Sequence, residues 1–272
     1  MFHFRIPGCR TSEVPYTDAA GRYTVAATPR CRRCDSALNY ILLEHQDFVG
    51  EDRVRLEGRR LRHVRDILGS ATGDALRVGV VGGRIGHGTI ERLDTDALEL
   101  VVQLDAEPPA PLPLRLILGL PRPKVLNRII AAAASMGIRE IDLIQSWRVE
   151  KSYWKSPRLS PENLRMQSLL GLEQAGDTVL PAIRLHRGFT SFVRGELQHA
   201  VNGHLALLAQ PGVEAEAPRH VGQSIILAIG PEGGFIDREV ETFREIGFSA
   251  VSLGSRILRV ETAIAYLAGR LF

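Results

Sequence analysis

Two short stretches near the C-terminus constrain this chain more than any other feature. Residues 228–235 read AIGPEGGF, and residues 253–263 read LGSRILRVETA. The run before the first loop, Ser224–Ile229, is too continuously apolar for a half-exposed strand, so it predicts a buried parallel strand. Phe248–Leu253 predicts a second strand before the other loop. Both stretches therefore have the pattern of a strand that ends in a small-residue loop.

Each loop is expected to open into a helix. Pro231 fixes one backbone torsion, and Gly233 and Gly234 permit positive φ or the close approach of a ligand. Asp237 is placed to cap the helix after the first loop, and the second helix is expected to start at about Arg256. These are two strand–loop–helix units in succession.

Loops at the carboxyl ends of parallel strands are where open α/β sheets bind ligands. The same loops are equally compatible with ordinary connections in which glycine serves only to turn the chain. Neither loop is a phosphate cradle of the usual kind, because GPEGG lacks a following Lys-Ser/Thr and its glycine spacing misses the dinucleotide fingerprint. From this pattern alone both interpretations stay open.

The two stretches, in this order and at the C-terminal end, resemble the SPOUT-class RNA methyltransferases, specifically the ribosomal RNA small subunit methyltransferase E family. The resemblance extends from about Leu38 to Phe272. It implies S-adenosylmethionine (SAM) held in a trefoil-knotted C-terminal fold and a homodimer. It also implies methylation of N3 of a uridine in small-subunit (16S) rRNA, as free rRNA or in the 30S subunit.

Composition narrows the class of protein only slightly. A chain of 272 residues has room for two ordinary domains, and a net charge of +3 is compatible with a nucleic-acid partner without requiring one. No apolar run approaches the length of a membrane span, and residues 1–7 lack the apolar centre of a signal peptide. A cytoplasmic protein without a membrane partner is expected.

Residues 1–37 are expected to form a disordered leader, because they mix Pro, Gly, Thr and Arg with little periodicity. All three cysteines lie in this leader, which excludes a disulfide framework from the rest of the chain. Cys31 and Cys34 have a metal-like spacing, but no second pair of ligands follows nearby. Two incidental thiols are the favoured interpretation, and no metal site is expected.

Residues 38–108 are expected to form a small β-barrel, which the resemblance makes a PUA-like RNA-binding domain. Short alternating runs predict its strands at Asn39–Leu43, Arg53–Leu56, Ala75–Val81, Arg84–Glu91 and Ala97–Leu104. One helical pattern, Arg59–Leu68, interrupts them. Arg59, Arg60 and Arg62 crowd this helix, where they either contact RNA phosphates or form a solvated face.

Residues 114–272 follow a proline-rich linker and are expected to form an α/β domain, the SPOUT α/β-knot domain of the resemblance. Strands at Leu114–Leu120, Ile138–Gln145 and Leu205–Gln210 alternate with helices at Val125–Met136 and Pro161–Leu172. Such alternation indicates a largely parallel sheet. The predicted fold class is thus α/β, with a small β-barrel domain before it.

By resemblance, the loops after three strands surround SAM, because adenine needs apolar walls and main-chain hydrogen bonds. The strands end at Gln210, Ile229 and Leu253. The residues expected to hold the cofactor are Leu208, Gln210, Ile229, Gly230, Pro231, Gly233, Gly234, Leu253, Gly254, Ile257, Leu258, Val260 and Thr262.

The expected reaction needs help with a proton, since N3 of uridine is protonated at neutral pH. Arg259 is the candidate for stabilising the uracil anion. Glu232 is a candidate proton acceptor, or it braces its loop; Glu261 is a weaker candidate that caps backbone amides or pairs with Arg259. Thr262 is expected near the start of the last helix. The buried stripe of that helix is expected to comprise Ile257, Val260, Ile264 and Leu267.

Further cations are expected on the RNA-facing side, where they would contact phosphate or ribose. By resemblance they are Arg122, Lys124 and Arg148, and a solvated surface is the alternative. The aromatic residues Trp147, Tyr153 and Trp154 interleave with cations near Arg148. Stacking on flipped bases and packing at a dimer interface explain them equally well.

The chain departs from the family pattern at four positions in the presumed RNA half. Ala132 and Ser135 stand where the family carries Lys and Glu, and Asp177 and Val179 replace arginines. Methyl-donor binding is therefore the safer expectation, and the identity of the target is the weaker one. The alternatives are methylation of another RNA and a non-catalytic RNA-binding factor in ribosome assembly.

Overall fold

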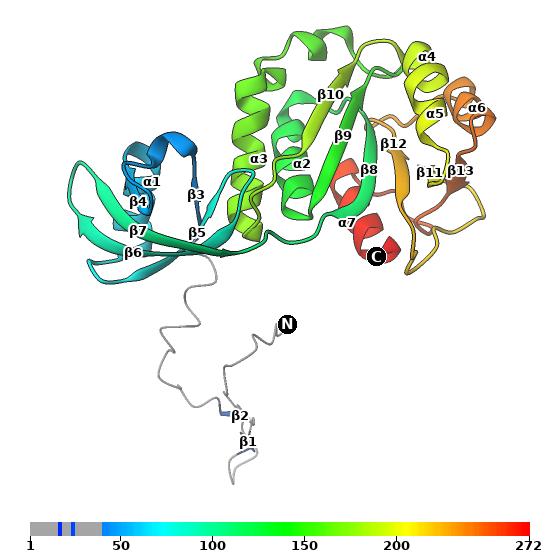
Figure 1. The fold of residues 1–272 in the computed structure, drawn as a ribbon. Coiled ribbons are helices and arrows are strands. Elements are labelled where there is room, and N and C mark those ends of the chain that lie inside the picture. Colours follow the sequence, from blue (N-terminus) through cyan, green and yellow to red (C-terminus); the bar gives the residue numbers. More distant parts are fainter. Residues whose placement is uncertain (1–15, 18–22, 25–39) are drawn as a thin grey trace. The chain divides into compact units, whose positions relative to one another are not determined.

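A computed structural model gives the structure of the protein for Tyr16–Thr17, Tyr23–Thr24 and residues 40–272 (Figure 1). The chain divides after Ala37, and its two parts are described separately. In the first part, β1 (Tyr16–Thr17) pairs antiparallel with β2 (Tyr23–Thr24). Cys31 and Cys34, and most of the predicted leader, lie outside the described residues.

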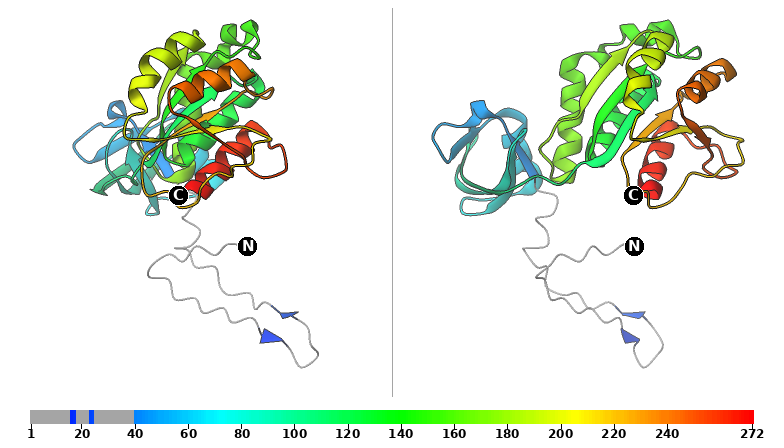
Figure 2. Two further views of the ribbon diagram at one scale, coloured as in Figure 1. Left: turned by 90° about the vertical axis from the view of Figure 1, so that its right-hand side faces the viewer. Right: turned by 45° about the vertical axis from the view of Figure 1, so that its right-hand side comes forward.

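The second part begins with a curled sheet of five strands in the order β3-β5-β6-β7-β4, a half-barrel in form (Figures 1 and 2). β3 and β5 are parallel, and the other pairs are antiparallel. The strands are β3 (Tyr40–Leu43), β4 (Arg53–Leu56), β5 (Ala75–Val80), β6 (Ile85–Leu93) and β7 (Leu98–Ala106). Their inward-facing aliphatic side chains form one buried cluster.

The predicted helix beside this sheet is present, but it changes its winding halfway. It runs as α1 (Gly58–Arg62) and continues as a π-helical turn, η3 (His63–Leu68). Gly69 ends it with φ +61, a left-handed conformation that glycine adopts without a Cβ penalty. Leu61 and Val64 face the sheet and are buried.

A six-stranded parallel sheet with the order β10-β9-β8-β12-β11-β13 forms the rest of the chain. Its strands are β8 (Leu112–Gly119), β9 (Ile138–Ile144), β10 (Ala182–His186), β11 (Leu205–Ala209), β12 (Ile225–Ile229) and β13 (Ser249–Val251). The helices are α2 (Pro123–Ser135), α3 (Pro161–Ala175), α4 (Phe189–Phe192), α5 (Gln198–Ala200), α6 (Asp237–Glu245) and α7 (Val260–Leu271). Single turns are η2 (His45–Asp47), η4 (Lys151–Lys155), η5 (Pro157–Leu159) and η6 (Val193–Leu197). The α/β prediction is confirmed for this part.

Both faces of the parallel sheet are covered, which explains the continuous apolar runs of its strands. In β8, Leu116 and Leu118 join the cluster formed with α2, α3 and α7, whereas Ile117 points to the cluster formed with η6 and α6. All five residues of β12 are buried. The prediction of a buried parallel strand at this position is therefore correct.

The predicted start of the last helix is wrong. The helix begins at Val260 rather than near Arg256, because Gly254 turns the chain with φ +99 and Arg259 is still extended. Ile257 is consequently 84% exposed and is not part of the buried stripe. Thr262 lies on the exposed side of the first helical turn. The segment between Gly254 and Val260, where the first helical turn was expected, is instead a loop that borders a cavity.

The cap of α6 also differs from the prediction. Asp237 is the first helical residue rather than the cap. Glu239, which is buried, accepts a hydrogen bond from the backbone N–H of Ile236 at 3.0 Å and satisfies the helix start from inside.

The strand β10 was not predicted, because its residues show no continuous apolar run.

Candidate active site

The carboxyl ends of the parallel strands carry a cavity of about 500 Å³, within the usual range for small-molecule sites. The chain leaves β8 toward β9 on one side, whereas β12 lies on the other side of β8, so the cavity adjoins the switch point of the sheet. The register pairs Ile229 with Leu118 and Ala209, and Ala209 with Val251. The loops after β11, β12 and β13 therefore leave the sheet side by side. We call this cavity the carboxyl-edge pocket.

Most residues predicted to hold a cofactor line the carboxyl-edge pocket. These are Gln210, Ile229, Gly230, Pro231, Gly234, Leu253, Gly254, Ile257, Leu258 and Val260. Three others do not: Leu208 is fully buried in the core, Gly233 faces Arg148, and Thr262 is exposed on α7. The structure thus brings the three predicted loops together around one cavity, and their contact with a cofactor stays a prediction.

The loop of residues 230–234 depends on glycine for close packing. A Cβ on Gly119, at the end of β8, would lie 2.4 Å from Cδ of Pro231, and a Cβ on Gly230 would lie 2.9 Å from the backbone of Gly234. Gly234 has φ +72, and its N–H donates to the carbonyl of Pro231 at 2.7 Å. The loop is a tight turn pressed against the neighbouring strand end, and its main chain faces the pocket.

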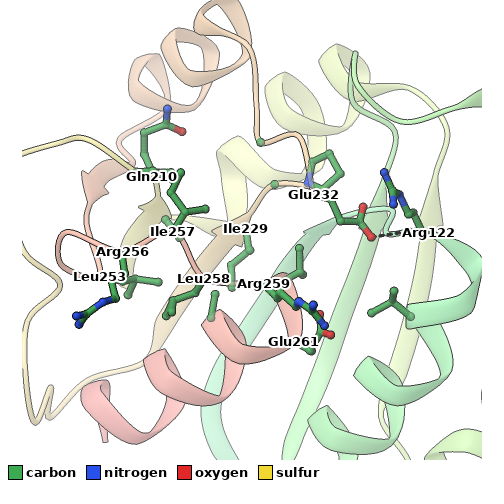
Figure 3. A pocket seen from close by; sticks show the side chains of 18 of the residues that line it. Arg122, Gln210, Ile229, Glu232, Leu253, Arg256, Ile257, Leu258, Arg259 and Glu261 are labelled. Carbon is green, nitrogen blue, oxygen red and sulfur yellow. Dashed lines mark hydrogen bonds between the residues drawn. The ribbon is translucent and has the colours of Figure 1, made fainter.

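Side chains from two other loops hold this turn in place. Oε1 of Glu232 accepts a hydrogen bond from the backbone N–H of Arg122 at 3.0 Å (Figure 3). The guanidinium of Arg148 donates to the carbonyl of Gly233. Oε1 of Glu239 accepts from the backbone N–H of Trp147 at 2.8 Å. The loops after β8, β9 and β12 are therefore tied into one unit.

The pocket carries more positive than negative charge. Its lining contains Arg122, Arg128, Arg256 and Arg259 against two carboxylates, Glu232 and Glu261. Glu261 lies 3.7 Å from Arg128, a contact that replaces the predicted pairing with Arg259.

Arg259 itself is the exposed N-cap residue of α7. Within residues 40–272 its guanidinium makes no hydrogen bond or ion pair, and Figure 3 shows it inside the pocket beside Glu261. A cation without a partner in a concave site is available to an anionic ligand or a developing negative charge.

The arginines of α1 that were predicted to contact RNA have surroundings different from those of Arg259. Arg59 forms a bidentate pair with Glu173 at 2.7 and 3.0 Å, and this hydrogen bonding raises the pKa of its guanidinium. Arg60 binds buried Asp47 at 2.6 Å and the carbonyl of Leu42 at 3.0 Å. These contacts favour a structural role for Arg59 and Arg60.

The remaining predicted RNA contacts lie on the surface. Arg62 is exposed, and so are Lys124 and Arg148 beside the carboxyl-edge pocket. Arg122 is exposed as well and lines the pocket itself. Within residues 40–272, these four cations are the exposed members of the predicted set that form no ion pair with a carboxylate, whereas Arg59 is exposed but paired with Glu173.

The positions at which the chain departs from the family pattern lie outside the pocket lining. Asp177 is buried; it accepts hydrogen bonds from the backbone N–H groups of Thr178 and Val179 at 2.6 and 3.1 Å. Its carboxylate also lies 3.5 Å from Arg139. Ser135 donates to the carbonyl of Ala132 within α2, at 2.8 Å. Each of these polar contacts is internal to the fold.

Sequence reasoning missed three residues that shape this site. Arg128 and Arg256 line the pocket, and Glu239 joins two loops. Arg256 belongs to the LGSRILR stretch and could have been found from it. Arg128 and Glu239 carry no local signal, because their roles depend on contacts between segments far apart in the sequence.

Neither a metal centre nor a membrane span is found in the part of the chain that the structure describes. No group of three or more His, Cys, Asp or Glu side chains there is arranged to hold a metal ion. No described helix combines the length and apolar character needed to cross a bilayer.

Comparison with known proteins gives a consistent family. The model of the RNA methyltransferase domain family matches residues 108–271. The ribosomal RNA small subunit methyltransferase E of Treponema pallidum is 31% identical over 236 residues, which cover 83% of this chain and 87% of that protein. Ribosomal RNA small subunit methyltransferase E 1 of Borreliella burgdorferi is 25% identical over 228 residues, covering 83% and 94%.

Solved structures share the fold. The ribosomal RNA small subunit methyltransferase E of Neisseria gonorrhoeae, solved with SAM bound, superposes with a TM-score of 0.66 at 23% identity, covering 85% of this chain and 94% of that one. A protein of Legionella pneumophila in complex with SAM gives a TM-score of 0.65 at 21% identity, covering 84% and 93%. With the family match and the relatives above, these findings lead to one conclusion: the chain belongs to the ribosomal RNA small subunit methyltransferase E family of RNA methyltransferases.

Proposed function

We propose that the protein transfers a methyl group from SAM to N3 of a uridine in small-subunit (16S) rRNA. The observation that carries this proposal is the carboxyl-edge pocket, which joins the GPEGG and LGSRILR loops and contains an arginine without an ion-pair partner in residues 40–272. The family relatives, all named as small-subunit rRNA methyltransferases, support the substrate class.

The residues of the pocket fit SAM. Ile229, Leu253 and Leu258 supply apolar walls for an adenine ring. The turn at 230–234 supplies main-chain donors and acceptors, and the excess of arginines suits a carboxylate. When bound, SAM supplies a methyl group on a positively charged sulfur, which a nitrogen nucleophile can accept.

Arg259 and Glu232 are the proposed catalytic residues. The guanidinium of Arg259 stabilises the negative charge that spreads over the uracil ring as N3 loses its proton. One oxygen of Glu232 is fixed by the N–H of Arg122, and the other has no partner within residues 40–272. That free oxygen accepts the N3 proton, while the fixed one sets the direction of the carboxylate.

The rest of the molecule is proposed to deliver the RNA. The half-barrel formed by β3 to β7 acts as a PUA-like RNA-binding domain, with Arg62 as its exposed phosphate contact. Arg122, Lys124 and Arg148 contact the backbone around the target nucleotide. Arg59 and Arg60, both paired with carboxylates, contribute to the fold of that region.

We further propose that residues 114–272 form a SPOUT domain with a trefoil knot and that the enzyme is a homodimer. Its substrate is the 30S subunit or its rRNA, in the cytoplasm. The buried contacts of Asp177 give that departure from the family pattern a structural explanation. We therefore keep the uridine target in preference to another RNA or a non-catalytic role.

The test uses the full chain and small ribosomal subunits from a strain that lacks the gene. Titration calorimetry is expected to show SAM binding, and nucleoside mass spectrometry is expected to show 3-methyluridine in the rRNA after incubation with enzyme and SAM. Arg219→Ala, an exposed arginine outside the pocket, is the matched control and should behave as wild type. Absence of SAM binding would end the enzymatic proposal; SAM binding with a different methylated nucleoside would change the substrate.

A further inference from the structure

Trp147 is an exposed aromatic residue that neither the core nor the carboxyl-edge pocket explains. Its side chain is 79% exposed, whereas an indole usually buries most of its apolar surface. It follows β9 directly, in the turn of residues 146–149. The other tryptophan, Trp154, is half-buried, and its ring N–H donates to Gln145.

The 146–149 turn is held from three sides, so Trp147 is presented by a fixed backbone. Glu239 accepts the N–H of Trp147 at 2.8 Å. Gln145 donates from its amide nitrogen to the carbonyls of Ser146 at 2.6 Å and Val149 at 3.0 Å. Arg148 donates to Gly233. Because none of these bonds uses the indole, the ring is free to contact a partner at low entropic cost.

This turn lies close to the catalytic loops. β9 and β12 are separated only by β8, which places their ends about 10 Å apart. The bond between Arg148 and Gly233 links the Trp147 turn directly to the loop that carries Glu232. A ligand that reaches from the carboxyl-edge pocket over β8 would therefore arrive at the turn that carries Trp147.

The charges around Trp147 select the class of partner. Arg148, Lys151, Lys155 and Arg158 follow it within one short segment, and all four are exposed. The only acidic residue among them is Glu150, which accepts a hydrogen bond from Tyr153 at 3.1 Å. Arg187 lies over the ring of Trp154 at 5.6 Å and adds another cation. A polyanion is attracted to such a surface, while a second copy of the same surface is repelled.

We propose that Trp147 is a substrate-binding residue that stacks on an unpaired RNA base next to the nucleotide in the carboxyl-edge pocket. The inference rests on the proposed function, since it needs RNA as the substrate. Stacking on an indole does not require a particular base, whereas pairing in a duplex prevents it. Trp147 therefore contributes affinity for single-stranded RNA, and the cations beside it contribute phosphate contacts.

The test compares Trp147→Ala and Trp147→Phe with wild type, using a fluorescein-labelled 20-nucleotide RNA either single-stranded or annealed to its complement. Trp147→Ala is expected to weaken single-strand binding by about tenfold and duplex binding by no more than about twofold. Trp147→Phe should retain most of the single-strand affinity, because a smaller aromatic ring still stacks. Met166→Ala, which removes another exposed apolar side chain, is the matched control.

Two further measurements separate this inference from its alternatives. SAM binding by calorimetry should be the same in Trp147→Ala and wild type; if wild type itself binds no SAM, the proposed function fails and the stacking result stands alone. Light scattering should give one oligomeric state for all variants. Unchanged RNA affinity of Trp147→Ala, equal losses for both RNA forms, or a shift from dimer to monomer would overturn the inference, the last in favour of a protein interface.

Discussion

The six-stranded sheet and the loops at its carboxyl edge carry two groups of arginines with opposite surroundings. In the middle of the sheet, Arg115 of β8 donates to Asp142 of β9 at 2.8 Å, and Asp142 also binds His186 of β10 at 2.8 Å. At the carboxyl edge, Arg256 and Arg259 line a cavity, and within residues 40–272 neither forms an ion pair. Charges that satisfy one another stabilise the fold, whereas charges with no protein partner are available to a ligand.

The central group is organised around a fully buried carboxylate. Asp142 is 0% exposed and has Arg184 at 3.6 Å in addition to its two hydrogen-bonded partners. Burial alone would lower the pKa of Arg115, but its bonds to Asp142 and Glu196 outweigh this and raise it. The ring of His186 stacks on Phe192 with 3.9 Å between centroids. The network joins three strands and one covering helix and leaves Asp142 no access to a substrate.

Removing the buried carboxylate should destabilise the protein more than removing any exposed charge. Asp142→Ala takes a buried carboxylate partner from both Arg115, which keeps Glu196, and His186, and it is expected to lower the free energy of unfolding by about 3 kcal/mol or more. Urea denaturation measures this difference. Glu140→Ala, which changes the same strand as Asp142→Ala but breaks only an exposed pair with Arg184 of β10, should cost less than about 1 kcal/mol. Equal costs for the two variants would remove the contrast between buried and exposed charge.

A change at the carboxyl edge should affect the rate and leave stability nearly intact. Arg259→Ala is expected to reduce kcat for methylation by about 100-fold, since one donor to a developing anion is lost. Arg259→Lys should recover only part of this rate, because a point charge replaces a planar fork. Single-turnover kinetics with bound SAM measure the effect. A normal rate in Arg259→Ala would show that the arginine does not stabilise the developing anion, whether or not it contributes to binding.

Variants of Glu232 test whether one carboxylate both braces its loop and accepts the N3 proton. Glu232→Gln keeps an acceptor for the N–H of Arg122 but cannot take a proton, so the rate should fall by about tenfold to 100-fold with little change in SAM affinity. This loss of rate is small for the removal of a general base. Glu232 is exposed, so water can accept the proton in its absence. Glu232→Ala should in addition weaken SAM binding. If only the Ala variant is impaired, the carboxylate braces the loop and takes no proton.

Local sequence patterns predicted the strands of the parallel sheet well where both faces are buried. Ser224–Ile229 and Leu114–Leu120 differ from β12 and β8 by only one or two residues at either end. The GPEGG turn was predicted because glycine and proline limit the backbone by themselves. β10 could not be found this way, since an edge strand with Arg184 and His186 has no continuous apolar run.

Patterns failed where a residue's environment comes from distant parts of the chain. Ile257 has the spacing of a buried helical residue. Because the chain turns at Gly254, the helix begins only after Ile257, and the side chain of Ile257 is exposed. Arg60 belongs to a basic cluster typical of RNA contacts, yet it pairs with Asp47. Glu261 was expected to cap backbone amides or to pair with Arg259, but its ion pair is with Arg128, which is 133 residues earlier by the numbering.

The sequence by itself determined the α/β class, the two loop motifs and the family, because these depend on residues adjacent in the chain. Only the tertiary structure decided which arginines are free. Whether a guanidinium is paired depends on which strand its neighbours join, and strand order places Asp142 beside Arg115 although 26 residues separate them. The same order sets the ends of β11, β12 and β13 side by side and thereby turns three ordinary loops into one pocket.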